Sequence, residues 1–262
     1  MNEQELILTS VLQCRRVDLY TGTVEVTADQ KQQLDDICSR RSSREPAQYI
    51  LRTCEFMGLD LYVDQRVLIP RPETELLVEA AATFLQKAGK PLSVLDIGTG
   101  SGNIIVSLAK NFSQHHFLAL DISKEALEVA RQNARTHDVF SRITFLEDDI
   151  FSDTCIRKIP LCDIVISNPP YIPSGDIADL QPEVLQEPHG ALDGGEDGLR
   201  FYRRIAQFTK HALSRNGFLF LEVGQGQAKD VQDILEQTGH LVVQGCLNDY
   251  SHIERVVIAQ RI

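Results

Sequence analysis

From residue 93 onward, short apolar runs alternate with amphipathic helical patterns, and this alternation limits the possible folds more than any other feature of the chain. One helical pattern follows Gly102, and others cover Lys124–His137, Leu199–Leu213 and Gln227–Gly239. The runs that read as strands are Ser93–Ile97, Phe117–Asp121, Ile143–Leu146, Asp163–Ser167, Gly217–Val223, Leu241–Cys246 and Arg255–Ala259. The pattern predicts an α/β fold with a seven-stranded, doubly wound sheet.

The last two predicted strands differ from the others because no helical pattern separates them. Parallel neighbours need a crossover of about a dozen residues or more, whereas antiparallel neighbours can be joined by a short turn. We therefore expect these two strands to pair antiparallel, with the final strand inserted at the edge of the sheet.

The residues before this region have a different pattern. Helical patterns cover the first dozen residues, Ala28–Arg41 and Pro46–Leu51. Residues 55–69 alternate around Gly58, which indicates a short β-hairpin. We predict a helical domain at residues 1–54, a β-hairpin linker at residues 55–71 and the large α/β domain at residues 72–262.

The formal net charge of −11 at pH 7 argues against a protein that binds DNA or RNA. Nucleic-acid-binding domains usually carry a basic surface, and none is apparent in bulk. Arg40, Arg41 and Arg44 form a basic cluster near the N-terminus. Because cations are favoured at the C-terminal end of a helix, a solvated helix end explains this cluster better than a binding patch does.

The composition also bears on where the protein is located and on whether it contains disulfides or a metal site. No apolar run approaches the roughly 18 residues that a membrane span needs, and the N-terminus lacks the basic start of a signal peptide. We expect a cytoplasmic protein. The six cysteines form no CxxC pair and the seven histidines form no HExxH pattern, so the sequence predicts neither a disulfide framework nor a metal site.

The first predicted strand runs directly into a glycine-rich loop. Alternate glycines let a backbone turn tightly and approach a ligand closely, and a strand, loop and helix of this kind also holds dinucleotides. A dinucleotide fingerprint, however, requires Gly or Ala at the position of Asn103. The loop therefore favours S-adenosylmethionine, which has no pyrophosphate to place on the helix N-terminus. The expected cofactor-binding residues are Gly98, Thr99, Gly100, Ser101 and Gly102.

Carboxylates follow the next two predicted strands. Asp121 ends the second strand, where a carboxylate can accept hydrogen bonds from both ribose hydroxyls. Asp148 and Asp149 follow the third strand, and an acid at that turn can bind the adenine amino group. The residue types leave open which of the two meets the adenine, and we assign Asp149. Two apolar residues are expected to flank the ring, Ile150 and Phe151.

The fourth predicted strand ends in Asn168, Pro169, Pro170 and Tyr171. Ligands bind at the carboxyl ends of strands in an open α/β sheet, so this motif should point into the same crevice as the glycine loop. We predict that these four residues are catalytic and that Asn168 also borders the cofactor.

The chemistry of a planar nitrogen explains these residue types. An amide or exocyclic amino nitrogen is a poor nucleophile because its lone pair is delocalised. Acceptors on its two N–H groups favour localisation, and the Asn168 side-chain oxygen and the Pro169 carbonyl can provide them. The two prolines stiffen the turn, and Tyr171 can stack on a planar group. Since the product can lose its proton afterwards, catalysis depends on alignment and preset electrostatics.

Together with the glycine loop, the Asn-Pro-Pro-Tyr motif resembles that of amino-methyltransferases acting on nitrogen, DNA adenine methyltransferases included. Three further segments narrow the resemblance: REPAQYI at residues 44–50, LIPRPETE at 68–75, and EPHGAL running into GGEDGL within 187–199. With them the chain resembles the release factor glutamine methyltransferases of the PrmC, or HemK, family. The resemblance covers nearly the whole chain and is weakest in residues 1–40.

That resemblance implies a reaction and an architecture. The family transfers a methyl group from S-adenosyl-L-methionine to the N5 amide of the glutamine in the Gly-Gly-Gln motif of class 1 peptide-chain release factors, which act in translation termination. It implies a helical domain that recognises the substrate protein, a hairpin linker and a Rossmann-like class I methyltransferase sheet. In the family, the residues matching Asn168, Pro169 and Pro170 bind the glutamine amide. At residues 148–151 the chain has DDIF, where the family usually carries Gly-Asp-Leu-Phe or a similar run.

We expect a monomeric enzyme with no direct nucleic-acid contact. Three other functions compete with the one that the resemblance implies. A DNA or RNA amino-methyltransferase would share the motif but should carry a basic target-recognition region. A non-catalytic S-adenosylmethionine-binding module should carry a damaged motif, and here the motif is intact. A nicotinamide oxidoreductase is disfavoured by Asn103 and by the absence of an evident hydride-transfer constellation.

Overall fold

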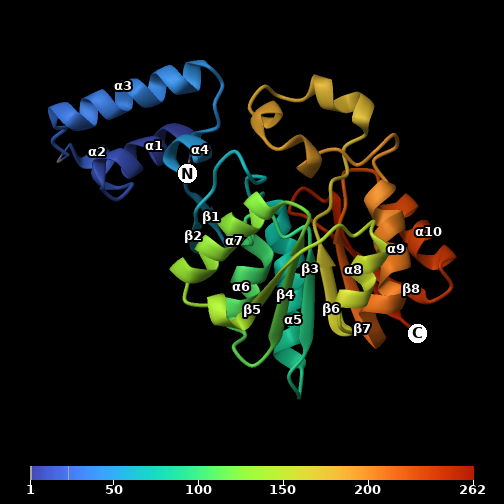
Figure 1. Ribbon diagram of the computed structural model, residues 1–262. Coiled ribbons are helices and arrows are strands. Elements are labelled where there is room, and N and C mark those ends of the chain that lie inside the picture. Colours follow the sequence, from blue (N-terminus) through green and yellow to red (C-terminus); the bar gives the residue numbers. More distant parts are fainter. Residues whose placement is uncertain (1, 23) are drawn as a thin grey trace.

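Within residues 2–22 and 24–262, which the computed structural model describes, the chain forms a seven-stranded sheet and a separate two-stranded hairpin. The strand order in the large sheet is β5-β4-β3-β6-β7-β9-β8, and the first five run parallel. The strands are β3 Ser93–Ile97, β4 His116–Asp121, β5 Ile143–Glu147, β6 Cys162–Ser167, β7 Leu213–Glu222, β8 Leu241–Asn248 and β9 Glu254–Arg261. The predicted doubly wound α/β sheet is therefore confirmed (Figure 1).

The final strand, β9, lies between β7 and β8 and pairs antiparallel with both. The expected antiparallel pair is confirmed, but the outermost place belongs to β8 and not to the final strand. Burial explains this correction. Val256, Val257 and Ala259 of β9 are fully buried, as suits an interior strand. Val242 of β8 stays 39% exposed, and the register of β8 shifts after Val243, which is typical of an edge strand.

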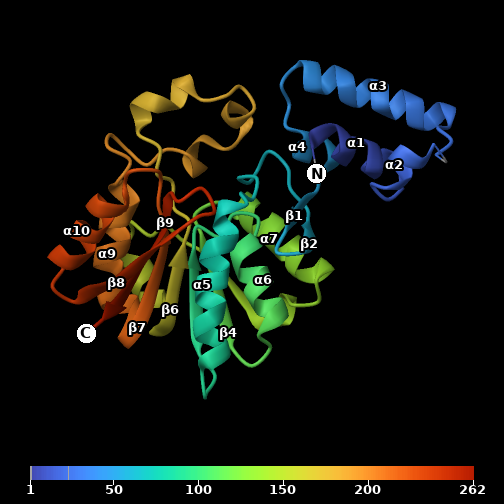
Figure 2. The ribbon, with the colours of Figure 1, turned by 180° about the vertical axis from the view of Figure 1, so that it is seen from behind.

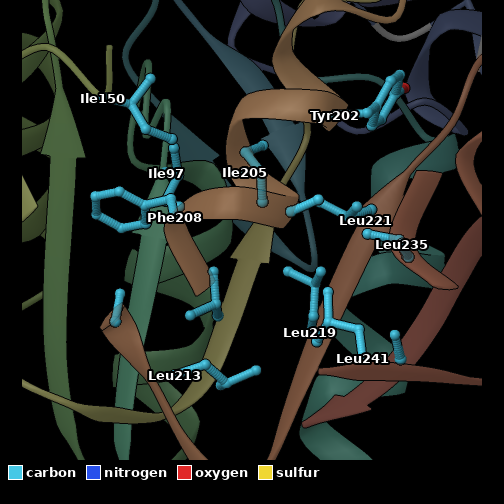
Figure 3. Packing of buried hydrophobic residues seen from close by; sticks show 14 of the residues in the cluster. Ile97, Ile150, Tyr202, Ile205, Phe208, Leu213, Leu219, Leu221, Leu235 and Leu241 are labelled. Carbon is cyan, nitrogen blue, oxygen red and sulfur yellow. The ribbon is translucent and has the colours of Figure 1, made fainter. Parts of the chain in front are cut away.

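Helices cover both faces of the sheet. They are α5 Glu73–Lys87, α6 Asn103–Asn111 and α7 Lys124–Thr136 on one face, and α8 Asp153–Lys158, α9 Arg200–Ala212 and α10 Ala228–Gln237 on the other. Adjacent residues such as Leu219 and Phe220 belong to different apolar clusters, because successive side chains of a strand point to opposite faces. Figure 2 shows α5 and α6 in front of the strands, and Figure 3 shows the cluster beneath α9.

Short 3₁₀ helices occupy two of the connections. One precedes β5, and the other three lie in the long segment between β6 and α9. Figure 1 shows this long segment, in gold, at the same end of the sheet as the N-terminal helices, in blue. The four are η1 Phe140–Arg142, η2 Ser174–Asp179, η3 Val184–Gln186 and η4 His189–Ala191.

The N-terminal region is helical, as the sequence predicts. Side-chain caps begin two of its helices, because Asn2 accepts a hydrogen bond from the Glu5 backbone N–H and Thr27 accepts one from Gln30. The helices are α1 Glu3–Leu12, α2 Asp18–Thr21, α3 Ala28–Ser42 and α4 Ala47–Leu51.

The hairpin after α4 is shorter than the sequence indicates. It consists of β1 Cys54–Phe56 and β2 Leu59–Leu61, whereas residues 62–71 form no strand. Val63, Val67 and Ile69 bury their side chains against Tyr49 and α7 instead. The Tyr49 hydroxyl also donates a hydrogen bond of 2.6 Å to the Val67 carbonyl. The second half of the predicted hairpin is thus a packed loop that joins α4 to the large domain.

The basic cluster at the end of α3 is held by carboxylates of the chain itself. Arg40 forms an ion pair with Glu45. Arg41 and Arg44 each lie 3.3 Å from the Glu183 carboxylate, on the segment between β6 and α9. The Arg41 side chain is only 18% exposed, so the expected solvated helix end is in part an internal contact between the N-terminal helices and that segment.

Candidate active site

The carboxyl ends of β3, β4 and β6 bring the predicted motifs together. The Gly98 N–H donates a hydrogen bond of 2.8 Å to the Leu120 carbonyl, which ties the glycine loop to β4. The Ser167 hydroxyl donates one of 2.7 Å to the Ile97 carbonyl, which ties the start of the Asn-Pro-Pro-Tyr motif to β3. Both bonds follow from the parallel register of neighbouring strands, as the sequence analysis expected.

The glycine loop needs its glycines for two reasons. Gly98, Gly100 and Gly102 all have positive φ angles, which side chains rarely tolerate. In addition, a Cβ atom on Gly102 would lie 3.1 Å from the Ala130 Cβ of α7, so α6 begins where only glycine fits closely. The loop therefore passes from β3 to α6 with its backbone exposed toward the ligand side.

A cavity of about 380 Å³ lies in front of this loop. Seven of the predicted cofactor-binding residues line it: Gly98, Gly100, Asp121, Asp149, Ile150, Phe151 and Asn168. The other three loop residues do not line the cavity and instead stabilise the loop on its side away from the cavity: Thr99, Ser101 and Gly102. The Thr99 hydroxyl donates to Asp96, and the Ser101 carbonyl accepts from Asn133.

Asn133 connects the loop to the linker as well. This fully buried side chain of α7 accepts from the Tyr62 N–H at 2.7 Å and donates to the Tyr62 carbonyl and to the Ser101 carbonyl, both at 2.9 Å. The three bonds use both the oxygen and the nitrogen of its side-chain amide. The linker and the glycine loop are therefore held by one side chain.

Asp121 is placed to receive a polyol at the cavity wall. Its two carboxylate oxygens accept hydrogen bonds from the Gly100 N–H at 2.8 Å and the Ser123 N–H at 2.9 Å. Each oxygen has a second acceptor site, so both can still bind ligand hydroxyls. Burial raises the pKa of Asp121, although the backbone donors oppose this shift. The geometry fits the two hydroxyls of a ribose.

The two acids after β5 have different partners. Asp148 forms an ion pair of 2.6 Å with Lys158. Asp149 accepts a hydrogen bond from the Phe151 N–H at 2.8 Å through one oxygen, which leaves the other oxygen for a ligand. The Phe151 ring is covered by the Arg200 guanidinium, 4.4 Å from the ring centroid. This difference favours the assignment of Asp149 to the adenine, which stays a prediction.

A second cavity, of about 220 Å³, shares four lining residues with the first, namely Leu68, Asn168, Pro169 and Ala191. Tyr171 and Arg71 line the second cavity, whereas Pro170 lines the first. The two cavities therefore meet at the motif that the sequence analysis assigned to catalysis.

Residues of other elements hold the Asn-Pro-Pro-Tyr motif in its conformation. The Asn168 side-chain nitrogen donates a hydrogen bond of 3.0 Å to the Thr74 hydroxyl. The Tyr171 carbonyl accepts from the Gln227 side chain at 2.9 Å. A Cβ atom on Gly198 would lie 2.3 Å from that carbonyl, and one on Gly194 would lie 2.8 Å from the Tyr171 Cα. The glycines of the GGEDG run thus let a loop lie directly against Tyr171.

Some residues of the site were not identified from the sequence. Glu187, which is only 5% exposed, accepts from the Ile69 N–H at 3.0 Å and forms an ion pair with Arg71. It thereby joins two segments that the family resemblance singled out without relating them. Others line the first cavity from the linker and from α9, namely Leu68, Arg200 and Phe201. Leu68 begins the LIPRPETE segment but was given no role from the sequence, and no local pattern marked Arg200 or Phe201, because their places at the cavity arise from distant segments meeting in space.

Two buried carboxyl groups stand behind the cavities. Burial raises the pKa of Asp96, at the end of β3, to about 7. Burial likewise raises the pKa of Glu222, at the end of β7, to about 7. Neither was proposed as a site residue from the sequence.

The fold and both parts of the chain match known proteins. A family model described as "Methyltransferase domain" matches residues 88–256, and one described as "PrmC N-terminal domain" matches residues 2–51. The solved catalytic domain of hMettl16, in complex with MAT2A 3'UTR hairpin 6, has a TM-score of 0.60 and 16% identity. The match covers 77% of this chain and 75% of that one, and at this identity it shows a shared fold.

Relatives that are similar in sequence identify the family more narrowly than the shared fold does. A release factor glutamine methyltransferase of Thermodesulfovibrio yellowstonii is 37% identical across 100% of this chain and 92% of the relative. Another, of Geobacter sulfurreducens, is 41% identical across 90% of this chain and 81% of the relative. With such similarity along its whole length, the chain belongs to the release factor glutamine methyltransferase family.

Proposed function

We propose that this enzyme transfers a methyl group from S-adenosyl-L-methionine to the N5 amide of the glutamine in the Gly-Gly-Gln motif of class 1 peptide-chain release factors, and so acts in translation termination. The observation that supports this most strongly is the meeting of two cavities at Asn168 and Pro169. One cavity fits a nucleoside, and the other opens on the same turn from the substrate side.

Each group of predicted cofactor-binding residues would bind a different part of S-adenosylmethionine. Asp121 would hold the ribose hydroxyls, and Asp149 would hold the adenine amino group between Ile150 and Phe151. The glycine loop would carry the rest of the molecule toward Asn168. When bound, S-adenosylmethionine supplies an electrophilic methyl group on a sulfonium centre.

The second cavity would take the glutamine side chain. Its wall is largely apolar, with Leu68, Ile172 and Leu192 among its lining residues. A loop with glycines on both sides of the acceptor has no side chains to clash with the turn, so it can approach Asn168 closely. The stiff Pro70–Pro72 loop, held by the Arg71–Glu187 ion pair, and the Pro169–Pro170 turn would bound this crevice.

The Asn-Pro-Pro-Tyr motif would act on the amide nitrogen. No residue among 2–22 and 24–262 donates a hydrogen bond to the Asn168 Oδ1 atom or to the Pro169 carbonyl. Both acceptors are therefore available to the two N–H groups of the substrate amide. Acceptance of these bonds localises the nitrogen lone pair, and Tyr171 stacks on the amide plane. The surplus proton leaves to water after transfer, so no strong base is required.

The N-terminal helices and the linker bear on how the enzyme would hold its protein substrate. The helical domain at residues 1–54, carried by the linker at 55–71, would hold the release factor at a second surface and thereby align the loop in the domain at 72–262. Arg41 and Arg44 are paired with Glu183, so this surface need not include them. No helix among the described residues is long and apolar enough to span a bilayer. We place the enzyme in the cytoplasm as a monomer that does not bind nucleic acid directly.

Mass spectrometry tests the reaction. A class 1 release factor incubated with the enzyme and S-adenosylmethionine is expected to gain one methyl group on the peptide that contains Gly-Gly-Gln. Duplex DNA incubated in parallel is expected to gain none. Methylated DNA beside an unmodified release factor would contradict the proposal and favour a nucleic-acid methyltransferase.

Replacement of Asp121 with alanine tests the cofactor assignment. Hydrogen bonds to a charged group contribute roughly 1.5–3 kcal/mol, so the Kd for S-adenosylmethionine is expected to rise about tenfold or more. Titration calorimetry measures it. Glu147→Ala is the matched control, because Glu147 pairs with Asp121 in the sheet but is exposed and lies outside the cavity. Equal affinities for the two variants would remove Asp121 from the site.

A further inference from the structure

We propose that Gln227 is a positioning residue, which fixes the ring of Tyr171 at the wall of the second cavity. The inference rests on the proposed function, since Tyr171 is the residue expected to stack on the glutamine amide. Gln227 lies between β7 and α10, in the run EVGQGQ at residues 222–227, which belongs to no motif identified from the sequence. It lines neither cavity, so any effect on the substrate must pass through another residue.

The two prolines of the motif do not by themselves fix Tyr171. Their rings restrict their own φ angles, whereas both backbone angles of Tyr171 remain free to rotate. The peptide group that follows Tyr171 is therefore held by its hydrogen bonds. Its N–H, from Ile172, donates to the Leu192 carbonyl at 3.0 Å, and its carbonyl accepts from Gln227 at 2.9 Å. The first bond alone would let the peptide pivot, and the second fixes its plane.

The side-chain amide of Gln227 has a backbone partner at each end. Its nitrogen donates to the Tyr171 carbonyl, and its oxygen accepts from the Gly224 N–H at 3.1 Å. A carbonyl can only accept and a backbone N–H can only donate, so one orientation of the amide satisfies both partners. Turned around, the amide would place two acceptors face to face at one end and two donors at the other. The amide thus ties Tyr171 to the loop after β7 in a defined way.

Two glycines make room for this amide. A Cβ atom on Gly224 would lie 2.6 Å from the Gln227 Oε1 atom and 3.0 Å from the Cδ2 atom of the Tyr171 ring. One on Gly198 would lie 2.7 Å from the Gln227 Nε2 atom. The amide therefore lies close to two backbones that carry no side chains, and the Tyr171 ring packs directly against one of them. This packing holds the ring in place as long as the amide is present.

The position of the ring matters because it must lie on the plane of the glutamine amide while the nitrogen faces the methyl group. A misplacement of roughly 1 Å can cost about 100-fold in rate. Asn168 has its own support in the hydrogen bond to Thr74, so loss of Gln227 should disturb mainly the ring. Tyr171 lines the second cavity and not the first. We therefore expect slower methylation with unchanged cofactor binding.

Steady-state methylation of a release factor by the full-length enzyme tests the proposal. Gln227→Glu keeps the shape and can still accept from Gly224, but its carboxylate cannot donate to the Tyr171 carbonyl. The kcat/KM for the release factor is expected to fall about tenfold or more, with an unchanged Kd for S-adenosylmethionine. Gln225→Glu is the matched control, because it adds the same charge at an exposed position of the same loop. It should leave both quantities unchanged.

A double-mutant cycle separates positioning of the ring from a general structural role. Tyr171→Ala removes the ring, so adding Gln227→Glu to it is expected to cost little more activity. Independent losses would instead multiply in the double variant. The unchanged Kd for S-adenosylmethionine shows for each variant that the domain is folded.

Gly224→Ala keeps the test decisive if Gln227→Glu fails to fold. Its methyl group should displace both the Gln227 amide and the Tyr171 ring, and so lower kcat/KM in the same way. Wild-type kcat/KM in Gln227→Glu or in Gly224→Ala, or losses that multiply in the double variant, would overturn the inference. In each of these cases the wild type still methylates the release factor, whereas failure of the wild type would reject the proposed function itself.

Discussion

Asn168→Ala is expected to lower kcat by roughly 10²–10³-fold, the loss typical of removing one preset electrostatic group from an active site. The Kd for S-adenosylmethionine should change far less, because Asn168 touches the first cavity only at its junction with the second. The physical reason is that its oxygen acts on the reacting nitrogen and gains its full effect only in the transition state. Single-turnover kinetics at saturating cofactor separate this loss from binding.

Asn168→Asp is the matched comparison. It keeps an acceptor toward the crevice, but it loses the donor to Thr74 and adds a negative charge beside a cavity that already contains Asp121. We expect turnover well below the wild type at neutral pH. If Asn168→Ala methylates at the wild-type rate, the proposed mechanism is wrong.

Changing the substrate glutamine to asparagine should abolish transfer to the release factor. Reacting atoms must come within roughly 3–3.5 Å for transfer, and the asparagine side chain is one methylene too short to place its nitrogen there. The Pro169–Pro170 turn is poorly able to shift toward it, because the two proline rings restrict the backbone φ angles. The measurement is mass spectrometry of the altered release factor after prolonged incubation.

Binding provides the control for this substrate change. The altered release factor should still associate with the enzyme, since most of the proposed contact lies outside the reacting side chain. Methylation of the asparagine at a rate near that of glutamine would show that the crevice does not set the reach of the acceptor.

The strands and the loops at their ends were predictable because they follow local rules. Short apolar runs mark strands such as Ser93–Ile97, which is buried along almost its whole length, and parallel strands place their carboxyl ends at one edge, so Gly98, Asp121 and Asn168 had to converge. The family segments indicated which chemistry this edge serves. The assignments of individual residues to the cofactor and the amide remain predictions.

Other features depend on contacts that no local pattern encodes. Glu187 meets Ile69 across 118 residues of chain, and Thr74 meets Asn168 across 94. Each is a polar residue whose partner is decided only when the elements pack. The place of β9 inside the sheet was missed for a similar reason, since a short connection predicts pairing but does not say which neighbour lies outside. The ion pairs of Arg41 likewise required the position of Glu183.

The buried amide of Asn133 has a thermodynamic consequence. It bonds at once to Tyr62 in the linker and to Ser101 in the glycine loop, so both segments depend on one orientation of its side chain, and opening of either leaves part of a buried amide unpaired. A ligand that makes the glycine loop more rigid therefore slows opening of the linker. By linkage, we expect that a release factor that immobilises the linker would raise the affinity of the loop for its ligand by the same factor. The backbone amide of Tyr62 would report this coupling through slower hydrogen exchange whichever of the two partners binds first.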